Sequence, residues 1–192
     1  VFEVEIRACR VIPQPLGAFF DYSFRSGTYE KMRRQKNLLI DIGFFTLDWL
    51  VADGVKMINA RSGAHNGGMS AVIQAMADAM GKDIGEPISD LSIVEEAIRE
   101  GRNPFIYGKE FDMTKYIKVG KAKAEQFVSV LVNRVGSSMD ITNIILAGGG
   151  ADFFLDVLES KFRNHEIITT KDPVFANVRG FQRASQQFLS QQ

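Results

Sequence analysis

The chain has few of the residues that cross-link a fold or bind a soft metal. It contains one cysteine, Cys9, and two histidines among 192 residues. One cysteine cannot form an internal disulfide, and two isolated histidines without cysteine partners do not make a zinc site. A chain with so little cysteine suits a reducing compartment, so we expect a cytoplasmic protein.

Neither sign of charge is in excess, and long apolar runs are missing. Lys and Arg together number 23, as do Asp and Glu, so the formal net charge is zero. A neutral chain has no general electrostatic attraction for nucleic acid or for an anionic membrane. No run approaches the roughly 18 apolar residues that a membrane-spanning helix needs. We therefore expect neither direct nucleic-acid binding nor a membrane partner.

The composition does provide material for a core. Apolar residues make up 45% of the chain, which includes 15 phenylalanines. A chain of this length forms one sizeable domain, or one domain with an insertion. Residues 1–9 alternate between apolar and mostly polar side chains, which predicts a half-buried strand. Because a strand pattern starts at once and there is no initiator methionine, we expect a piece of a longer protein.

Residues 38–51 are the most informative stretch. They predict two apolar strands joined by a tight turn that carries Asp41 and Gly43, and the second strand carries Thr46 and Asp48. An acidic residue and a glycine at the tip of a buried hairpin could meet a phosphate and its metal ion. A hairpin whose tip is merely polar is the alternative, and the spacing alone does not separate the two.

The segments on either side of this hairpin predict further elements. Before it, Pro15 begins an expected helix that reaches Phe24, and the basic run at residues 26–36 is expected to be a solvated link. After it, an Asp-Gly turn predicts a third strand over residues 55–60. A polar, glycine-rich link then opens an expected helix over residues 69–80.

Residues 82–113 predict a small subdomain inserted into the main fold. Ser92–Glu95 has the pattern of a capping box at the start of a helix, and a short hairpin is expected to turn near Gly108 and Lys109. A long amphipathic helix is expected over residues 114–139, because its apolar residues recur at close to a 3.6-residue period.

The second informative stretch is an apolar strand over residues 142–147 that runs into Gly148–Gly150. Without Cβ atoms, three glycines let a flat ring or a phosphate lie against the backbone. The stretch fits neither the G-x-G-x-x-G pattern nor the P-loop, so it supports neither a dinucleotide fold nor a Walker NTPase. A helix, a short strand at residues 166–168 and a last helix follow. Gly180 inside the last helix indicates close packing or a break.

The order of these elements predicts an α/β fold with a mixed sheet and helices packed on its faces. That order, together with the glycine turn and the motifs at residues 12–18, 41–49 and 172–181, resembles the second domain of the actin-like ATPases. The motifs are most similar to those of the ParM/StbA plasmid-segregation ATPases, and within them to the protein D family of the PRTRC plasmid system. The resemblance implies a ribonuclease H-like domain with a mixed five-stranded sheet, helices on both faces and a small inserted subdomain.

The resemblance also implies a division of the chain. Residues 1–36 would be a connecting strand and helix from the preceding domain, residues 37–81 and 114–192 the core of the second domain, and residues 82–113 the insert. The first phosphate loop of the fold would then belong to the preceding domain. We therefore expect these residues alone to bind ATP weakly and to hydrolyse it negligibly.

The resemblance implies a site for ATP or ADP with Mg²⁺. Asp41 would hold the water shell of the Mg²⁺ ion and Gln14 would orient the attacking water, so these are the expected catalytic residues. Phe44 and Phe45 stand where the family usually has small residues, and their rings would either point away or crowd the γ-phosphate. The residues expected to contact the nucleotide are Gly43, Phe44, Phe45, Thr46, Asn66, Gly67, Gly68, Lys121, Gly148, Gly149 and Gly150.

The function that the resemblance implies for the whole protein is an ATP-binding filament former used in plasmid segregation. ATP hydrolysis would control polymer assembly, and subunits would add head to tail without closing a ring. An adaptor protein bound to centromere-like DNA would connect the filament to the plasmid. Two alternatives stay open: a small-molecule kinase of the same superfamily, and a nucleotide-sensing or structural module with little hydrolysis.

Overall fold

The computed structural model describes Cys9 and residues 11–189 of the chain. The strand expected over residues 1–9 lies outside these residues, Cys9 excepted. The helices are α1 (Leu16–Arg25), α2 (Tyr29–Met32), α3 (Met69–Ile84), α4 (Ser92–Glu100), α5 (Thr114–Val135), α6 (Ala151–Lys161) and α7 (Ala176–Leu189), with short 3₁₀ turns at Asn59–Arg61 and Pro173–Phe175. In the described part of the chain, none of these helices has the length and apolar character needed to cross a membrane.

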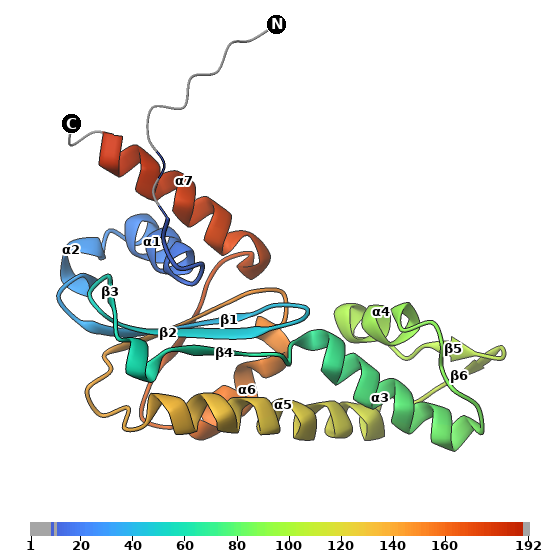
Figure 1. Cartoon of the computed structure of the whole chain (residues 1–192). Coiled ribbons are helices and arrows are strands. Elements are labelled where there is room, and N and C mark those ends of the chain that lie inside the picture. The colour runs from blue at the N-terminus through green and yellow to red at the C-terminus, as the bar shows by residue number, and fades with distance from the viewer. Residues whose placement is uncertain (1–8, 10, 190–192) are drawn as a thin grey trace, which may run out of the picture.

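A mixed sheet forms the centre of the molecule (Figure 1). Its main path runs β3-β2-β1-β7-β8, and β4 also pairs with β2. β1 is antiparallel to β2 but parallel to β7, which is in turn parallel to β8. The five strands of the main path confirm the expected mixed sheet. The strands are β1 (Lys36–Ile42), β2 (Leu47–Asp53), β3 (Lys56–Met57), β4 (Gly63–His65), β7 (Asn143–Ala147) and β8 (Ile167–Thr169).

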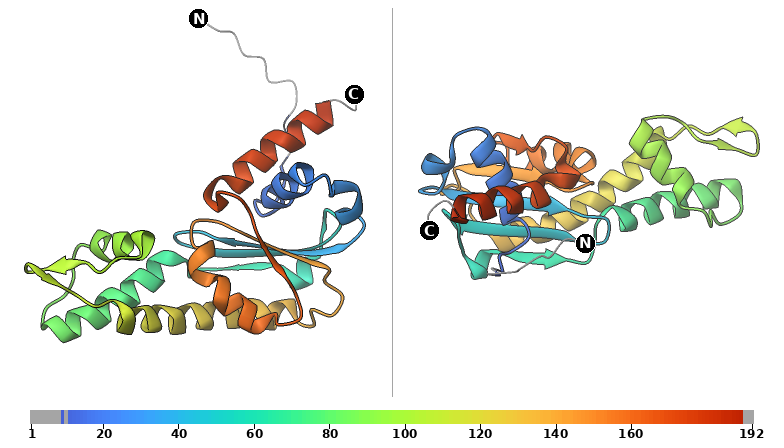
Figure 2. Two further views of the ribbon diagram at one scale, coloured as in Figure 1. Left: turned by 180° about the vertical axis from the view of Figure 1, so that it is seen from behind. Right: turned by 90° about the horizontal axis from the view of Figure 1, so that it is seen from above.

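Helices cover both faces of this sheet, as expected. α1 and α7 lie on one face, and α3, α5 and α6 lie on the other (Figures 1 and 2). The alternation of β1 explains the two layers: Leu38 and Ile40 pack in the core on the side of α3, α5 and α6, while Leu39 packs in the core beside α1 and α7. A strand buried on both faces needs a continuous apolar run, which is the pattern of this segment.

α1 and α7 cross with their backbones in contact. A Cβ atom added to Gly180 would lie 1.7 Å from the carbonyl oxygen of Gly17. Beside this crossing, Asp21 is fully buried. Its carboxylate forms salt bridges with Arg179 at 3.1 Å and with Arg183 at 3.3 Å. Close packing is therefore the reason for a glycine inside α7, which was one of the two expected explanations.

Four sequence-based predictions were wrong in detail. The long helix expected over residues 114–139 ends at Val135. The third strand covers only Lys56–Met57, and the polar link after it contains the unexpected strand β4, which pairs with β2. α3 continues past residue 80 and ends at Ile84, and the residue that caps it, Gly85, is in the left-handed conformation. Ser92 does not cap α4: it is the first helical residue, and its amide donates to Asp90 at 3.0 Å.

The segment between α3 and α5 lies at the far end of these two helices, away from most of the sheet (Figures 1 and 2). It contains α4 and a two-stranded sheet of β5 (Phe105–Ile106) and β6 (Lys109–Glu110), so the expected hairpin is confirmed. Val94 and Ala97 of α4 belong to the same hydrophobic cluster as α3 and α5. The division of the chain into a core and an inserted subdomain stays a prediction.

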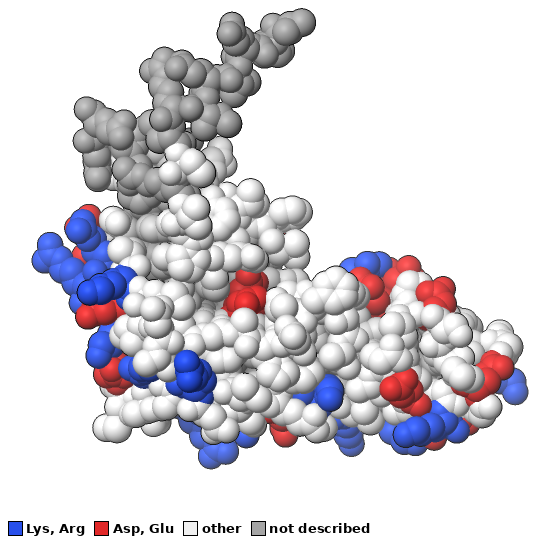
Figure 3. All heavy atoms as spheres, viewed as in Figure 1, with Lys and Arg blue, Asp and Glu red and all other residues white. Residues whose placement is uncertain are grey.

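The basic run at residues 26–36 is more ordered than a solvated link. It contains α2, and Met32 at the end of that helix is 2% exposed. On the face drawn in Figure 3, Lys and Arg side chains gather at the end of the molecule where α2 lies, and acidic side chains are interspersed among them.

Candidate functional site

The site is built around Asp41, near the carboxyl end of β1. Its side chain is only 4% exposed. Two side-chain amides donate to the same carboxylate oxygen, Oδ2: Nδ2 of Asn177 at 2.7 Å and Nε2 of Gln14 at 2.9 Å. These residues come from the starts of α7 and α1, so three distant segments of the chain meet at one carboxylate.

The surroundings of Asp41 act on its pKa in both directions. Burial raises the pKa of this carboxyl above its ordinary value, and the neighbouring carboxylate of Asp48 adds to the rise. The hydrogen bonds from Asn177 and Gln14 oppose the rise, because an amide donor stabilises the charged form. Thr46 donates to Asp48 at 2.7 Å. The two amides therefore help to keep a buried carboxylate ionised.

The turn between β1 and β2 presents unpaired backbone donors. Among the described residues, the backbone amides of Phe44, Phe45 and Thr46 donate no hydrogen bond. The carbonyls of the same turn are occupied, because those of Gly43 and Phe44 accept from the first residues of α3 at 3.1 and 2.8 Å. The carbonyls thus attach the turn to α3, while its successive amides stay free. Such an arrangement of amides is suited to bind an anion.

Gly68 makes this attachment possible. Its amide donates to the carbonyl of Phe45 at 3.2 Å. A Cβ atom on Gly68 would lie 2.4 Å from the carbonyl oxygen of Gly43 and 2.6 Å from that of Phe44. The glycine-rich link therefore fixes the position of the turn between β1 and β2.

The glycine turn after β7 lies beside Asp41. Gly148 has a φ of +89°, and a Cβ atom there would lie 2.5 Å from Oδ1 of Asp41. Gly150 is equally confined, because its Cβ would lie 2.4 Å from Cγ2 of Ile42. Gly149 between them is open, with only Val174 near its Cβ position, at 3.7 Å. The turn thus packs tightly at both ends and leaves its middle free.

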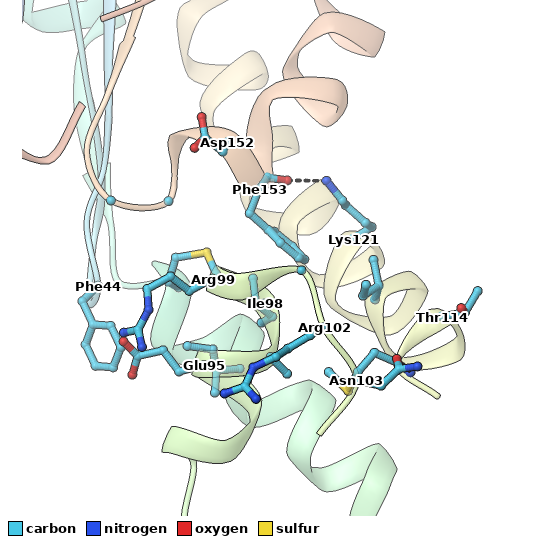
Figure 4. A pocket seen from close by; sticks show the side chains of 18 of the residues that line it. Phe44, Glu95, Ile98, Arg99, Arg102, Asn103, Thr114, Lys121, Asp152 and Phe153 are labelled. Carbon is cyan, nitrogen blue, oxygen red and sulfur yellow. Dashed lines mark hydrogen bonds between the residues drawn. The ribbon is translucent and has the colours of Figure 1, made fainter. Parts of the chain in front are cut away.

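A cavity of about 780 Å³ opens from Gly149 and Gly150 towards α4 and α5. Asp152 and Phe153 at the start of α6 line one side of it, and Phe44 lies near Glu95 and Arg99 of α4 on another (Figure 4). Arg102, just after α4, also lines the cavity. Lys121 of α5 lies along the wall, where its ammonium group donates to the carbonyl of Phe153 and pairs with Asp156 at 2.6 Å. This volume lies within the range of small-molecule sites in proteins.

Comparison with known proteins assigns the fold. The sequence profile described as "Archaeal actin homologue MreB-like, C-terminal" matches residues 39–160, well over half of the chain. The chain belongs to this family. A comparison of this chain with curated proteins found no significant match.

Several solved structures share this fold at low sequence identity. The MreB-like domain superposes on Ta0583, an archaeal actin homologue, with a TM-score of 0.80 at 19% identity, over 91% of this chain and 55% of that one. The structure of the same protein in complex with ADP superposes with a TM-score of 0.77 at 20% identity, over 91% of this chain and 56% of that one. A ParM filament from Clostridium botulinum superposes with a TM-score of 0.75 at 22% identity, over 93% of this chain and 53% of that one. The MreB-like domain thus spans about half the length of these proteins, which share its actin-like fold.

The structure brings most of the expected site residues of the MreB-like domain together. Gln14 contacts Asp41, and Gly148 packs against the same carboxylate. Phe44, Lys121, Gly149 and Gly150 all line the cavity. The expected roles of these residues in binding a nucleotide stay predictions.

Other expected residues lie outside the cavity. Asn66 is exposed, and Gly67 is buried against the rings of His65 and Phe127 rather than facing the cavity. Phe45 is 72% exposed and packs edge-on against Phe44, with ring centroids 4.8 Å apart. Asn66, Gly67, Gly68, Phe45 and Thr46 are not among the residues that line the cavity.

The prediction missed Asn177 and the polar residues of α4. Asn177 lies in a motif that supported the resemblance, but nothing in its local sequence indicates a bond to a carboxylate 136 positions away. Glu95 and Arg99 reach the cavity because α4 folds back beside α3 and the start of α5 (Figure 1), and Arg102 follows directly after α4. A charged residue on an amphipathic helix gives no signal that distinguishes a cavity wall from an ordinary solvated face.

The residues present suit Mg²⁺ bound through water better than a metal held by the protein alone. Within the described residues, no group of three or more His, Cys, Asp or Glu side chains could hold a metal ion. Mg²⁺ in nucleotide sites is held by one or two carboxylates together with substrate phosphates and water. One carboxylate, Asp41, close to the unpaired amides of Phe44–Thr46, fits that pattern.

Proposed function

We propose that this MreB-like domain is the ATP-binding second half of an actin-like, filament-forming ATPase. The observation that carries the proposal is the placement of Asp41, which lies buried between a turn with unpaired amides and a glycine turn that borders a cavity. The amides suit the phosphates, and the open face of Gly149 suits the flat surface of a sugar or base. The cavity is large enough for the rest of the nucleotide.

Each residue has a distinct part in this proposal. Asp41 would hold Mg²⁺ through bound water, and the ion would supply positive charge near the phosphates. Gln14 lies exposed above Asp41 and orients the attacking water through its amide. Lys121 contributes the alkyl part of its side chain to the adenine wall, because its ammonium group is engaged by α6.

The proposed role of the whole protein is plasmid or DNA segregation, in the manner of the ParM/StbA family and its PRTRC protein D members. ATP hydrolysis controls the assembly of a head-to-tail filament, and an adaptor on centromere-like DNA attaches the cargo. Support comes from the motifs at residues 12–18, 41–49 and 172–181, and from the shared fold with a ParM that was solved as a filament. The solved complex of Ta0583 with ADP supports the choice of nucleotide.

One feature favours a second candidate, a nucleotide-sensing or structural module with little hydrolysis. Phe44 lines the cavity next to the unpaired amides, and its side chain is 48% exposed. A bulky ring at this point occupies space that a γ-phosphate and its attacking water need. Such a module keeps the nucleotide site but hydrolyses ATP slowly.

The test uses the full-length protein, with both halves of the cleft. We expect ATP with Mg²⁺ to make the protein sediment as polymer, and phosphate release to accompany assembly. Asp41→Asn is expected to abolish phosphate release, whereas the control Asp78→Asn, on the exposed face of α3, leaves it unchanged. Nucleotide binding without sedimentation or phosphate release would favour the second candidate, and the absence of nucleotide binding would refute the proposal.

A further inference from the structure

Asn177 connects two helix ends to the buried carboxylate. Its Oδ1 accepts a hydrogen bond from the backbone amide of Ala18 at 3.0 Å, and its Nδ2 donates to Oδ2 of Asp41 at 2.7 Å. The residue at the N-cap position of α1 is Pro15, which has no side-chain group to cap the helix. Asn177 therefore satisfies one of the free amides of α1 from another helix, a task that an N-cap side chain usually performs.

The backbone of Asn177 has little freedom to move away from α1. A Cβ atom on Gly17 would lie 2.5 Å from the carbonyl oxygen of Asn177 and 2.6 Å from its Cα. One turn further along α7, Gly180 is in similar contact with Gly17. The crossing of α1 and α7 therefore sets where the amide of Asn177 stands relative to Asp41.

We propose that Asn177 is a positioning residue that orients the carboxylate of Asp41 for nucleotide-bound Mg²⁺ and makes this orientation depend on the α1–α7 crossing. This inference rests on the proposed function. The carboxylate of Asp41 has Oδ2 held by two amides, and its Oδ1 faces Gly148. A carboxylate held on one oxygen cannot rotate freely, so its other oxygen keeps one direction towards the metal-bound water.

A structural role alone is the competing explanation, because Asn177 also caps α1. The two functions use different atoms of the side chain, so one substitution separates them. Asn177→Asp keeps an oxygen that accepts from the amide of Ala18, but it cannot donate to Asp41 and places a second carboxylate beside it. Asn177→Ala removes both interactions, and Gln182→Ala on the exposed side of α7 is the matched control.

The experiment measures binding of ADP by the full-length protein, with and without Mg²⁺, by calorimetry. In the wild-type protein, Mg²⁺ is expected to strengthen ADP binding. In Asn177→Asp we expect this Mg²⁺-dependent gain to fall about 10- to 100-fold, the usual effect of removing a partner of a metal-binding carboxylate. Binding without Mg²⁺ is expected to change less, and hydrogen exchange at Ala18 is expected to stay as slow as in Gln182→Ala. The like charge beside Asp41 is expected to lower the unfolding midpoint of Asn177→Asp.

Each outcome decides between the two roles. An unchanged Mg²⁺-dependent gain in Asn177→Asp, with fast hydrogen exchange at Ala18 only in Asn177→Ala, would leave Asn177 as a helix cap and overturn the inference. Failure of Asn177→Ala to fold does not affect this comparison, because Asn177→Asp carries it. If the wild-type protein binds no ADP under either condition, the proposed function itself is refuted, and the inference fails with it.

Discussion

Replacing Gly180 by alanine tests the helix crossing that supports the site. In an ordinary helix this change stabilises the protein by up to about 1 kcal/mol, because glycine is a poor helix former. Here the new Cβ atom would stand 1.7 Å from the carbonyl oxygen of Gly17. A normal carbon–oxygen contact is about 3.3 Å, so α1 and α7 must separate by roughly 1.6 Å.

That separation outweighs the gain in helix propensity. Overpacking of a well-packed contact costs about 1–3 kcal/mol and occasionally more, and the atom encountered here is backbone that cannot rotate aside. The same movement would lengthen the bond from Asn177 to Asp41 from 2.7 Å. A shift of roughly 1.6 Å takes that bond beyond any hydrogen-bond distance. We therefore expect Gly180→Ala to destabilise the protein by about 3 kcal/mol and to weaken Mg²⁺-dependent nucleotide binding.

Urea denaturation of the full-length protein followed by circular dichroism measures the first effect, and calorimetry with ADP and Mg²⁺ measures the second. The matched control is Gly120→Ala in α5, where the nearest atom to the new Cβ is Sδ of Met76 at 2.7 Å. A flexible methionine can move, so the control is expected to change stability by about 1 kcal/mol or less. A Gly180→Ala protein that is as stable as wild type would refute the description of this crossing.

Three further predictions concern separate parts of the chain. A hydrogen bond from Arg61 lowers the pKa of Asp140 to about 2, so this interaction stabilises the fold above pH 4 and is lost as the pH falls towards 2. The stability of Asp140→Asn should therefore fall less steeply with pH in that window than the stability of the wild-type protein. The difference is small, because the exposed pair contributes only about 1 kcal/mol or less to stability. Burial raises the pKa of the Tyr116 hydroxyl to about 12. A titration of tyrosine absorbance that gives Tyr116 a pKa near 10 would contradict this. Phe44→Ala is expected to speed phosphate release several-fold, because its ring occupies space that the γ-phosphate and the attacking water need. In the control Phe45→Ala, outside the cavity, the rate of release is expected to stay within about twofold of wild type. Slower release in Phe44→Ala would show that its ring supports the nucleotide.

The sequence predicted the parts of the site that depend on local patterns. The strand that ends near Asp41 is a continuous apolar run, and the glycine turn follows another such run, so the order of residues alone is enough to locate both. β4 escaped prediction because it has three residues, two of them glycine and alanine, and owes its form to pairing with β2. β-structure of this kind depends on the neighbouring strand rather than on intrinsic preference.

The contacts that complete the site could not be predicted in the same way. The bond between Asn177 and Asp41 joins residues 136 positions apart, and it exists because α1 and α7 cross at two glycines. Gly180 gave a local sign of close packing but not of its partner. Long-range polar contacts depend on the packing of whole elements, so a single sequence shows the residues without showing which pairs will meet.

The site combines parts of unequal freedom. Asp41 lies on β1, which pairs with β2 on one side and β7 on the other. Gly148 and Gly150 are confined as well, because a Cβ atom at either position would lie too close to its neighbours. Gln14 and Asn177 stand instead at the ends of helices, where the backbone is less constrained by the sheet. A change in the α1–α7 crossing would therefore move the two amides before it moved the carboxylate or the glycine turn. It follows that the orientation of Asp41 can respond to the position of these helices while the glycine turn stays in place.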